Sequence, residues 1–136
     1  MGVAHCFFFD YRLSNYEGSG APDPSMDPAL IAKLNMTCAR NAGATAFLDQ
    51  STSFVMDNHF FKQILLRKGV LQIDQELALD NSSVRFVSGF ASNEVVFHQS
   101  FAKAMIKLGS VQVLVGKAGE IRKNCRVFNT PKKKSK

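Results

Sequence analysis

Apolar residues recur at helical spacing along most of this chain, and this periodicity limits its possible folds more than any other feature. Four segments show it, and they begin near Asp27, Asp57, Val84 and Ser92. Strand patterns are few, because only residues 111–115 alternate, and only over a short run. The sequence therefore predicts an all-α fold with extended loops, among them a turn-rich loop between Tyr16 and Asp27.

The helix boundaries follow from capping chemistry. Asp27 can cap the first helix and Pro28 suits its first turn, while Gly69 is expected to end the second helix. Ser92 is the expected cap of the longest helix, which should end at Gly109. The predicted inward positions of the first, second and fourth helices are Leu30, Ile31, Leu34 and Cys38; Phe60, Phe61, Ile64 and Leu65; and Phe97, Phe101, Ala104, Met105 and Leu108.

Length and charge exclude several classes of protein. A chain of 136 residues, 46% hydrophobic and 21% charged, suits one folded domain. Its net charge of +6 becomes only +2 without four C-terminal lysines, so no nucleic-acid-binding face is expected. Those lysines lie in a tail, residues 130–136, which is either a disordered solvated end or a nuclear-localisation or polyanion-binding patch. The longest apolar run, residues 6–9, is too short to span a membrane.

The N-terminus predicts no secretory signal, because residues 1–6 lack a basic region and no long apolar stretch follows. If Met1 is the true start, a cytosolic location is expected. The chain has three cysteines, Cys6, Cys38 and Cys125, so at least one has no partner within it. None of the common nucleotide-binding, zinc-protease or serine-hydrolase motifs occurs. The histidines, His5, His59 and His98, lack metal-ligand spacing, which favours structural roles.

Residues 49–57 include two carboxylates, eight residues apart, with hydroxyl side chains between them. Asp49, Thr52 and Asp57 could surround a hard cation such as Ca²⁺ if the loop curls round it. Alternatively, Asp57 is a helix cap and Asp49 a turn residue. Asp74 opens a further helical stretch, either as a cap or as the partner of a metal-bound histidine.

Several segments, taken in order, resemble the C-terminal half of a plant secretory (class III) haem peroxidase. The similarity extends from Gly2 to Asn129, and we take residues 1–129 as one partial domain, the C-terminal half of a haem peroxidase domain. The segments that carry it are residues 2–6, 12–16, 22–27, 56–61, 69–77, 101–105 with 108–109, and 119–126.

The resemblance implies a disulfide between Cys6 and Cys38, and a partner for Cys125 in the N-terminal half of the family fold. It also implies that Asp49, Thr52 and Asp57 bind calcium through their side chains, with the Val55 carbonyl. Calcium thereby becomes the preferred interpretation of this loop.

The resemblance further implies haem b as a cofactor. The proximal histidine of the family would lie two places before Met1, while the distal arginine and histidine and a second calcium site belong to the N-terminal half. Asp74 matches the aspartate that accepts a hydrogen bond from the proximal histidine, and His5 would lie near the haem edge. No residue of this chain is therefore expected to act as a catalytic or haem-binding residue by itself.

By resemblance, the parent function is one-electron oxidation of phenolic donors by hydrogen peroxide, in peroxide catabolism and the response to oxidative stress. The family is extracellular, secreted or vacuolar. The 136-residue chain alone is expected to be inactive, and the N-terminal half is its expected packing partner. The alternatives are a small helical calcium-binding or basic-tailed interaction module without enzymatic activity, and an incomplete gene model or pseudogene product.

Overall fold

We analysed a computed structural model of the chain, which describes residues 2–39, 41 and 43–129. Its described part contains six α-helices and one two-stranded sheet, so the predicted, predominantly helical fold is confirmed. The chain forms two compact units that divide after Phe101. The Lys-rich tail predicted at residues 130–136 lies outside the described residues. None of the described helices combines the length and hydrophobicity that a membrane span requires.

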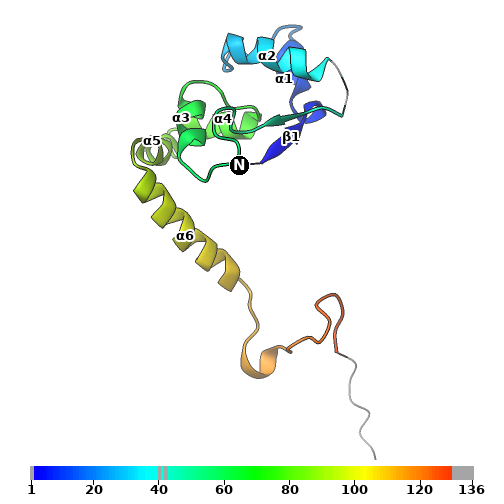
Figure 1. Ribbon diagram of the computed structural model, residues 1–136, viewed down its shortest axis with the longest axis vertical. Coiled ribbons are helices and arrows are strands. Elements are labelled where there is room, and N and C mark those ends of the chain that lie inside the picture. Colours follow the sequence, from blue (N-terminus) through cyan, green and yellow to red (C-terminus); the bar gives the residue numbers. More distant parts are fainter. Residues whose placement is uncertain (1, 40, 42, 130–136) are drawn as a thin grey trace, which may run out of the picture. The chain divides into compact units, whose positions relative to one another are not determined.

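The first unit begins with a short antiparallel sheet (Figure 1). Strand β1 (Val3–His5) pairs with β2 (Thr45–Phe47), with Ala4 opposite Ala46. Both alanines are buried, whereas their neighbours in each strand are exposed. Because a three-residue strand shows no alternation that a sequence pattern could reveal, these strands were not predicted.

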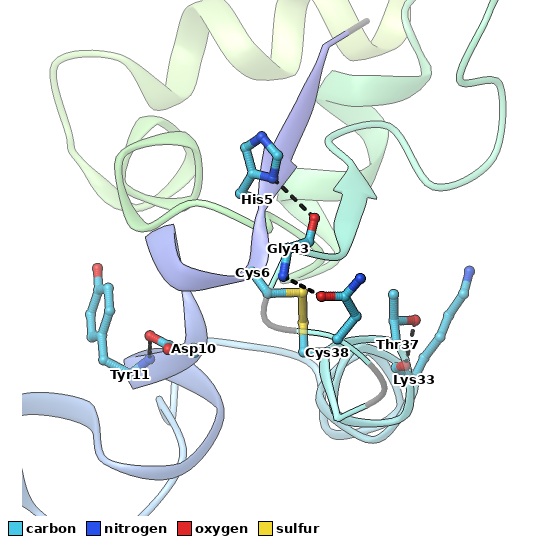
Figure 2. Close-up of a disulfide and its surroundings, with 9 residues drawn as sticks. His5, Cys6, Asp10, Tyr11, Lys33, Thr37, Cys38 and Gly43 are labelled. Atoms are coloured by element: carbon cyan, nitrogen blue, oxygen red, sulfur yellow. Dashed lines mark hydrogen bonds between the residues drawn. A yellow bond between two sulfur atoms is a disulfide. The ribbon is translucent and has the colours of Figure 1, made fainter.

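Helices α1 (Asp10–Ser14) and α2 (Pro28–Cys38) pack beside this sheet. Asp27 caps α2 as predicted, since its Oδ1 accepts a 2.9 Å hydrogen bond from the Leu30 amide. A disulfide joins Cys6 to Cys38, the pair that the resemblance implied, and ties the end of α2 to the segment after β1 (Figure 2). The core around it consists of Ala4, Cys6, Phe9, Leu13, Met26, Leu30, Leu34, Ala46 and Val70.

Helices α3 (His59–Leu65), α4 (Gln72–Leu79) and α5 (Val84–Ser92) lie against one another in the same unit (Figure 1). Their shared core is formed by Phe60, Ile64 and Val87. The prediction that the second helix continues to Gly69 is wrong. It ends at Leu65, because Arg67 adopts a left-handed backbone conformation (φ 61°) that closes the last turn. Leu65 itself is 40% exposed and not inward as predicted.

The longest helix, α6, extends over Glu94–Ser110, and the division between the units falls within it. Ser92 was predicted to cap it, but the Ser92 hydroxyl donates to the Gly89 carbonyl of α5 instead. Asn93 takes the capping role, accepting a 3.1 Å hydrogen bond from the Val96 amide. Phe97 is buried, whereas the predicted inward positions Phe101, Met105 and Leu108 are exposed.

The second unit contains the end of α6 and a 3₁₀ turn at Gly116–Ala118. The strand pattern at residues 111–115 does not form a strand, and Gln112 has a left-handed backbone (φ 54°) incompatible with one. The Asn129 side-chain oxygen accepts a hydrogen bond from the Lys123 amide, and Asn129 donates to Glu120 and to the Ile121 carbonyl. These bonds close a loop that contains the free thiol of Cys125. Cys125 is exposed.

Candidate functional site

The predicted cation-binding residues lie on one loop, residues 49–57, which joins β2 to the segment before α3 and which we call the acidic loop. The structure brings three of its oxygen-bearing side chains together. The Thr52 hydroxyl oxygen lies 2.9 Å from Oδ2 of Asp49 and 3.0 Å from Oδ1 of Asp57. Asp49 is fully buried and Asp57 is buried to 9% exposure. Two carboxylates thus meet at one hydroxyl below the protein surface.

Asp49 organises the first half of this loop. Its Oδ1 accepts hydrogen bonds from the backbone amides of Ser51 at 2.9 Å and Thr52 at 3.0 Å, which is the bonding of an Asx turn. The Ser53 hydroxyl donates to the Asp49 carbonyl at 2.7 Å, and the Val55 amide donates to the Thr52 carbonyl at 2.9 Å. The loop therefore curls back on Asp49, as a cation-binding loop must.

A side chain of α3 supports Asp49 from the other side. The Gln63 amide nitrogen donates to Oδ1 of Asp49 and, at 2.7 Å, to the Ser51 hydroxyl. The Gln63 amide oxygen accepts from the Gln50 backbone amide at 2.9 Å. Gln63 is 7% exposed, so its amide is almost wholly occupied by this loop. Sequence reasoning missed Gln63, because nothing in its spacing distinguishes it from an ordinary buried helix residue.

These contacts set the ionisation of Asp49. Burial removes water from the carboxyl and raises its pKa, but hydrogen bonds from Thr52, Ser51 and Gln63 favour the charged form more strongly. The net result is a pKa below the ordinary value for Asp49. At neutral pH the loop therefore presents a buried negative charge beside the Thr52 hydroxyl.

Proton counting shows why a cation would suit this arrangement. A hydroxyl has one hydrogen and can donate it to only one acceptor at a time. The Thr52 hydroxyl can therefore serve only one of its two short contacts with carboxylate oxygens, and the other contact is repulsive. A hard cation that accepts carboxylate, hydroxyl and carbonyl oxygens would relieve this repulsion. Among the described residues no cluster of three or more His, Cys, Asp or Glu side chains forms, so such a site depends on the hydroxyl and backbone oxygens as well.

The second half of the loop is anchored to the helices around it. Oδ1 of Asp57 accepts a 2.9 Å hydrogen bond from the amide of His59, the first residue of α3. The alternative prediction that Asp57 is the helix cap is wrong in position, because Asn58 is the residue at the cap of α3. The next residue, Asn58, donates from its side chain to the carbonyls of Phe90 and Ala91, both at 2.9 Å. Asn58 is 2% exposed and links the loop to the end of α5.

Asp74, in the first turn of α4, is a second candidate functional residue. Its Oδ2 is buried and, among the described residues, has no hydrogen-bond partner. Desolvation by burial raises the pKa of Asp74, although the positive charge of Arg12 lowers it in part. A buried carboxylate oxygen without a donor is costly, and such atoms mark places where a donor is expected.

Arg12 fixes the turn that precedes α4. Its guanidinium forms a fully buried ion pair with Asp23 at 2.8 Å. It also donates to the carbonyls of Gly69 at 2.9 Å and Val70 at 2.8 Å. Hydrogen bonds from Ser25 and Arg12 outweigh the effect of burial, so the pKa of Asp23 lies below its ordinary value. Sequence reasoning placed Arg12 in a segment of resemblance but assigned it no structural role.

The three histidines lie apart and form no common site in the described part of the chain. His5, on β1, has Nδ1 3.2 Å from the Gly43 carbonyl (Figure 2). Its ring stacks on Phe7. His59 begins α3. His98, on α6, has Nε2 2.7 Å from the Met56 carbonyl. The predicted structural roles therefore fit His5 and His98.

Comparison with known proteins gives a consistent assignment. A family model described as "Peroxidase" matches residues 1–93. Peroxidase 57 of Arabidopsis thaliana is 51% identical over 129 residues, covering 95% of this chain and 41% of the relative. Peroxidase 28 of the same plant is 51% identical over 132 residues, with the same coverage of both chains. Peroxidase 44 is 46% identical over 129 residues, covering 95% of this chain and 39% of the relative.

The chain thus spans about two-fifths of the length of these curated relatives. The match to the family model covers more than half of the chain and includes the acidic loop, Asp74 and the disulfide. Its mostly helical structure agrees with part of a peroxidase fold. We conclude that this chain belongs to the peroxidase family.

Proposed function

We propose that this chain provides the calcium-binding and disulfide-closed part of a plant haem peroxidase, whose reaction is one-electron oxidation of phenolic donors by hydrogen peroxide. The observation that supports this most strongly is the convergence of Asp49, Thr52 and Asp57 oxygens on one point. With the Val55 carbonyl they would give four ligands to a calcium ion, which usually takes six to eight oxygens. Further ligands would come from water or from residues outside this set.

The environment of Asp74 supports the haem part of the proposal. An imidazole N–H donated to Oδ2 of Asp74 would satisfy an oxygen that otherwise lacks a partner. Such a bond fixes the orientation of an iron-binding histidine and makes its other nitrogen more basic. Haem, when bound, supplies the redox chemistry of peroxide reduction. In this proposal Asp74 would accept a hydrogen bond from Nδ1 of the histidine that binds haem, and Arg12 holds the turn in front of Asp74 in place.

No histidine of this chain fits the axial position, by its contacts or by the resemblance. His5 and His98 bond to backbone carbonyls, and the resemblance assigns no haem-binding role to His59, the first residue of α3. We therefore propose that the 136-residue chain alone has no peroxidase activity, and that activity requires the residues that hold and face haem in the rest of the family fold.

Peroxide-dependent oxidation of guaiacol, measured after reconstitution with haemin, tests the proposal that the chain alone has no peroxidase activity. The expected rate equals that of free haemin, and turnover above that rate would contradict it. Substitution of Asp74 by Asn should leave the rate unchanged, because without an axial histidine Asp74 has no partner to orient.

Calorimetric titration with CaCl₂ tests the calcium site. We expect one ion bound per chain in the wild type and no binding in Asp57→Ala. The matched control is Asp80→Ala, which removes an exposed carboxylate that bonds only within its own turn. Asp80→Ala should bind as the wild type does, and binding that survives Asp57→Ala would reject this site.

The disulfide bears on location. Protein disulfides persist mainly in oxidising compartments. The Cys6–Cys38 bond therefore supports an extracellular or vacuolar location, as in the family, over the cytosol.

A further inference from the structure

His98 makes a contact that the peroxidase assignment does not explain. It lies on α6, 42 residues from Met56 in sequence, and its Nε2 is 2.7 Å from the Met56 carbonyl oxygen. A carbonyl only accepts, so Nε2 carries the hydrogen and donates it. The nearest carboxylate oxygen, of Glu94, is 3.9 Å from the same nitrogen, too far for a hydrogen bond. The Met56 carbonyl is therefore the main partner of this imidazole.

Met56 lies between two proposed calcium ligands of the acidic loop. These are the carbonyl of Val55 and the carboxylate of Asp57. The carbonyl that His98 contacts belongs to the peptide that joins Met56 to Asp57. This peptide follows the one that carries the Val55 carbonyl and leads directly into Asp57, so its orientation affects how the two proposed ligands are placed relative to each other. Val55 is 54% exposed and Met56 is 47% exposed, so side-chain packing restrains this stretch only weakly.

The loop is then held at both sides of Asp57. Asn58 binds the carbonyls at the end of α5, as described above, and His98 binds Met56 from α6. Both contacts fall within the first unit. We propose that His98 is a positioning residue for calcium: its hydrogen bond to the Met56 carbonyl sets the peptide between the Val55 and Asp57 ligands and so raises calcium affinity.

This inference rests on the calcium site proposed above, and its test separates the two. Calorimetric titration with CaCl₂ should show His98→Ala binding roughly two- to tenfold more weakly than wild type, the range expected for loss of one exposed hydrogen bond. His98→Gln should restore the affinity, because its terminal amide can donate from a position near that of Nε2. Gln99→Ala is the matched control, since Gln99 is the exposed neighbouring residue on α6, and it should bind as wild type does.

Unfolding midpoints in EDTA supply the second readout. A positioning role predicts that His98→Ala reduces the rise in midpoint that calcium produces and changes the midpoint in EDTA much less. Wild-type affinity in His98→Ala would overturn this inference and leave the calcium site standing. Equal weakening in His98→Ala and His98→Gln, or an equal loss of midpoint with and without calcium, would also overturn it. Absence of calcium binding in the wild type would overturn both proposals.

Discussion

Two buried aspartates of this chain have opposite surroundings, and the difference comes from the donors near them. Asp49 receives backbone, hydroxyl and amide hydrogen bonds, which keep its pKa low in spite of burial. Asp74 has a buried oxygen with no donor among the described residues, and its pKa is raised. The charge of Asp49 is thus supported within this chain, whereas the charge of Asp74 is not. The contribution of Asp74 to stability is therefore expected to depend on pH.

Replacement of Asp74 by Asn tests that contrast. A carboxyl whose pKa is raised on folding binds its proton more tightly in the folded state, so it costs stability as pH rises from its ordinary value near 3.8 through the raised value. We expect Asp74→Asn to be more stable than wild type at pH 7, with the difference shrinking toward zero as pH falls to the ordinary value. Urea unfolding across this range measures it. A difference that does not change with pH would contradict the assignment.

The buried guanidinium of Arg12 is the other residue on which local structure depends. It neutralises Asp23 and satisfies two backbone carbonyls of the turn before α4. Substitution of Arg12 by Met removes one partner of a buried pair, which costs about 3–5 kcal/mol. Denaturant unfolding should show this loss. Lys62→Met, at an exposed position of α3, is the control and should change stability by no more than about 0.5 kcal/mol. A loss of similar size in both variants would contradict the role of Arg12.

At the scale of elements, sequence patterns predicted long helices well and short or irregular elements poorly. The start of α2 followed from Asp27 and Pro28, because capping is a local interaction. The end of α3 was not predicted correctly from Gly69, because a glycine is needed at position 69 for a different reason. A Cβ at Gly69 would lie 3.0 Å from the Gln75 Cα, so this glycine allows α4 to approach the turn. The end of α3 depends instead on the left-handed Arg67, which no residue preference indicated.

In the candidate site, too, the residues within one short stretch of sequence were predicted and the tertiary contacts were not. Asp49, Thr52 and Asp57 were predicted, because ligand types and spacing are visible in one short stretch of sequence. Gln63, Asn58 and His98 were not predicted as supports of that loop. Each comes from a helix or from a tertiary contact, and the contact exists only once the helices pack.

For the whole molecule, the disulfide is the main covalent constraint in the described part of the chain. The Cys6–Cys38 bond closes 32 residues of sequence separation, for which loop-closure entropy predicts about 3–4 kcal/mol of stabilisation. Reduction with dithiothreitol should lower the free energy of unfolding by this amount. Cys125→Ser, which changes the exposed free thiol, should leave it unchanged. If reduction had no effect on stability, the bond would not constrain the fold as described.

The first unit also leaves many large apolar side chains exposed. Phe7, Phe8, Phe54, Leu66 and Ile73 are each more than half exposed. Exposed apolar surface of this kind promotes association. We therefore expect concentration-dependent self-association of the isolated chain in sedimentation velocity. A monomer at all concentrations would contradict this expectation.

Three side chains of one loop, Asp49, Thr52 and Asp57, are proposed to bind calcium in this peroxidase-family chain. The thermal unfolding midpoint of the full chain, followed by circular dichroism in CaCl₂ and in EDTA, tests this proposal. Binding to the folded state alone stabilises it by about 2.7 kcal/mol when free calcium is 100 times the dissociation constant. We expect a clear rise in the wild-type midpoint with calcium and none in the double variant Asp49→Asn, Asp57→Asn. Equal midpoints for the wild type in CaCl₂ and in EDTA would contradict it.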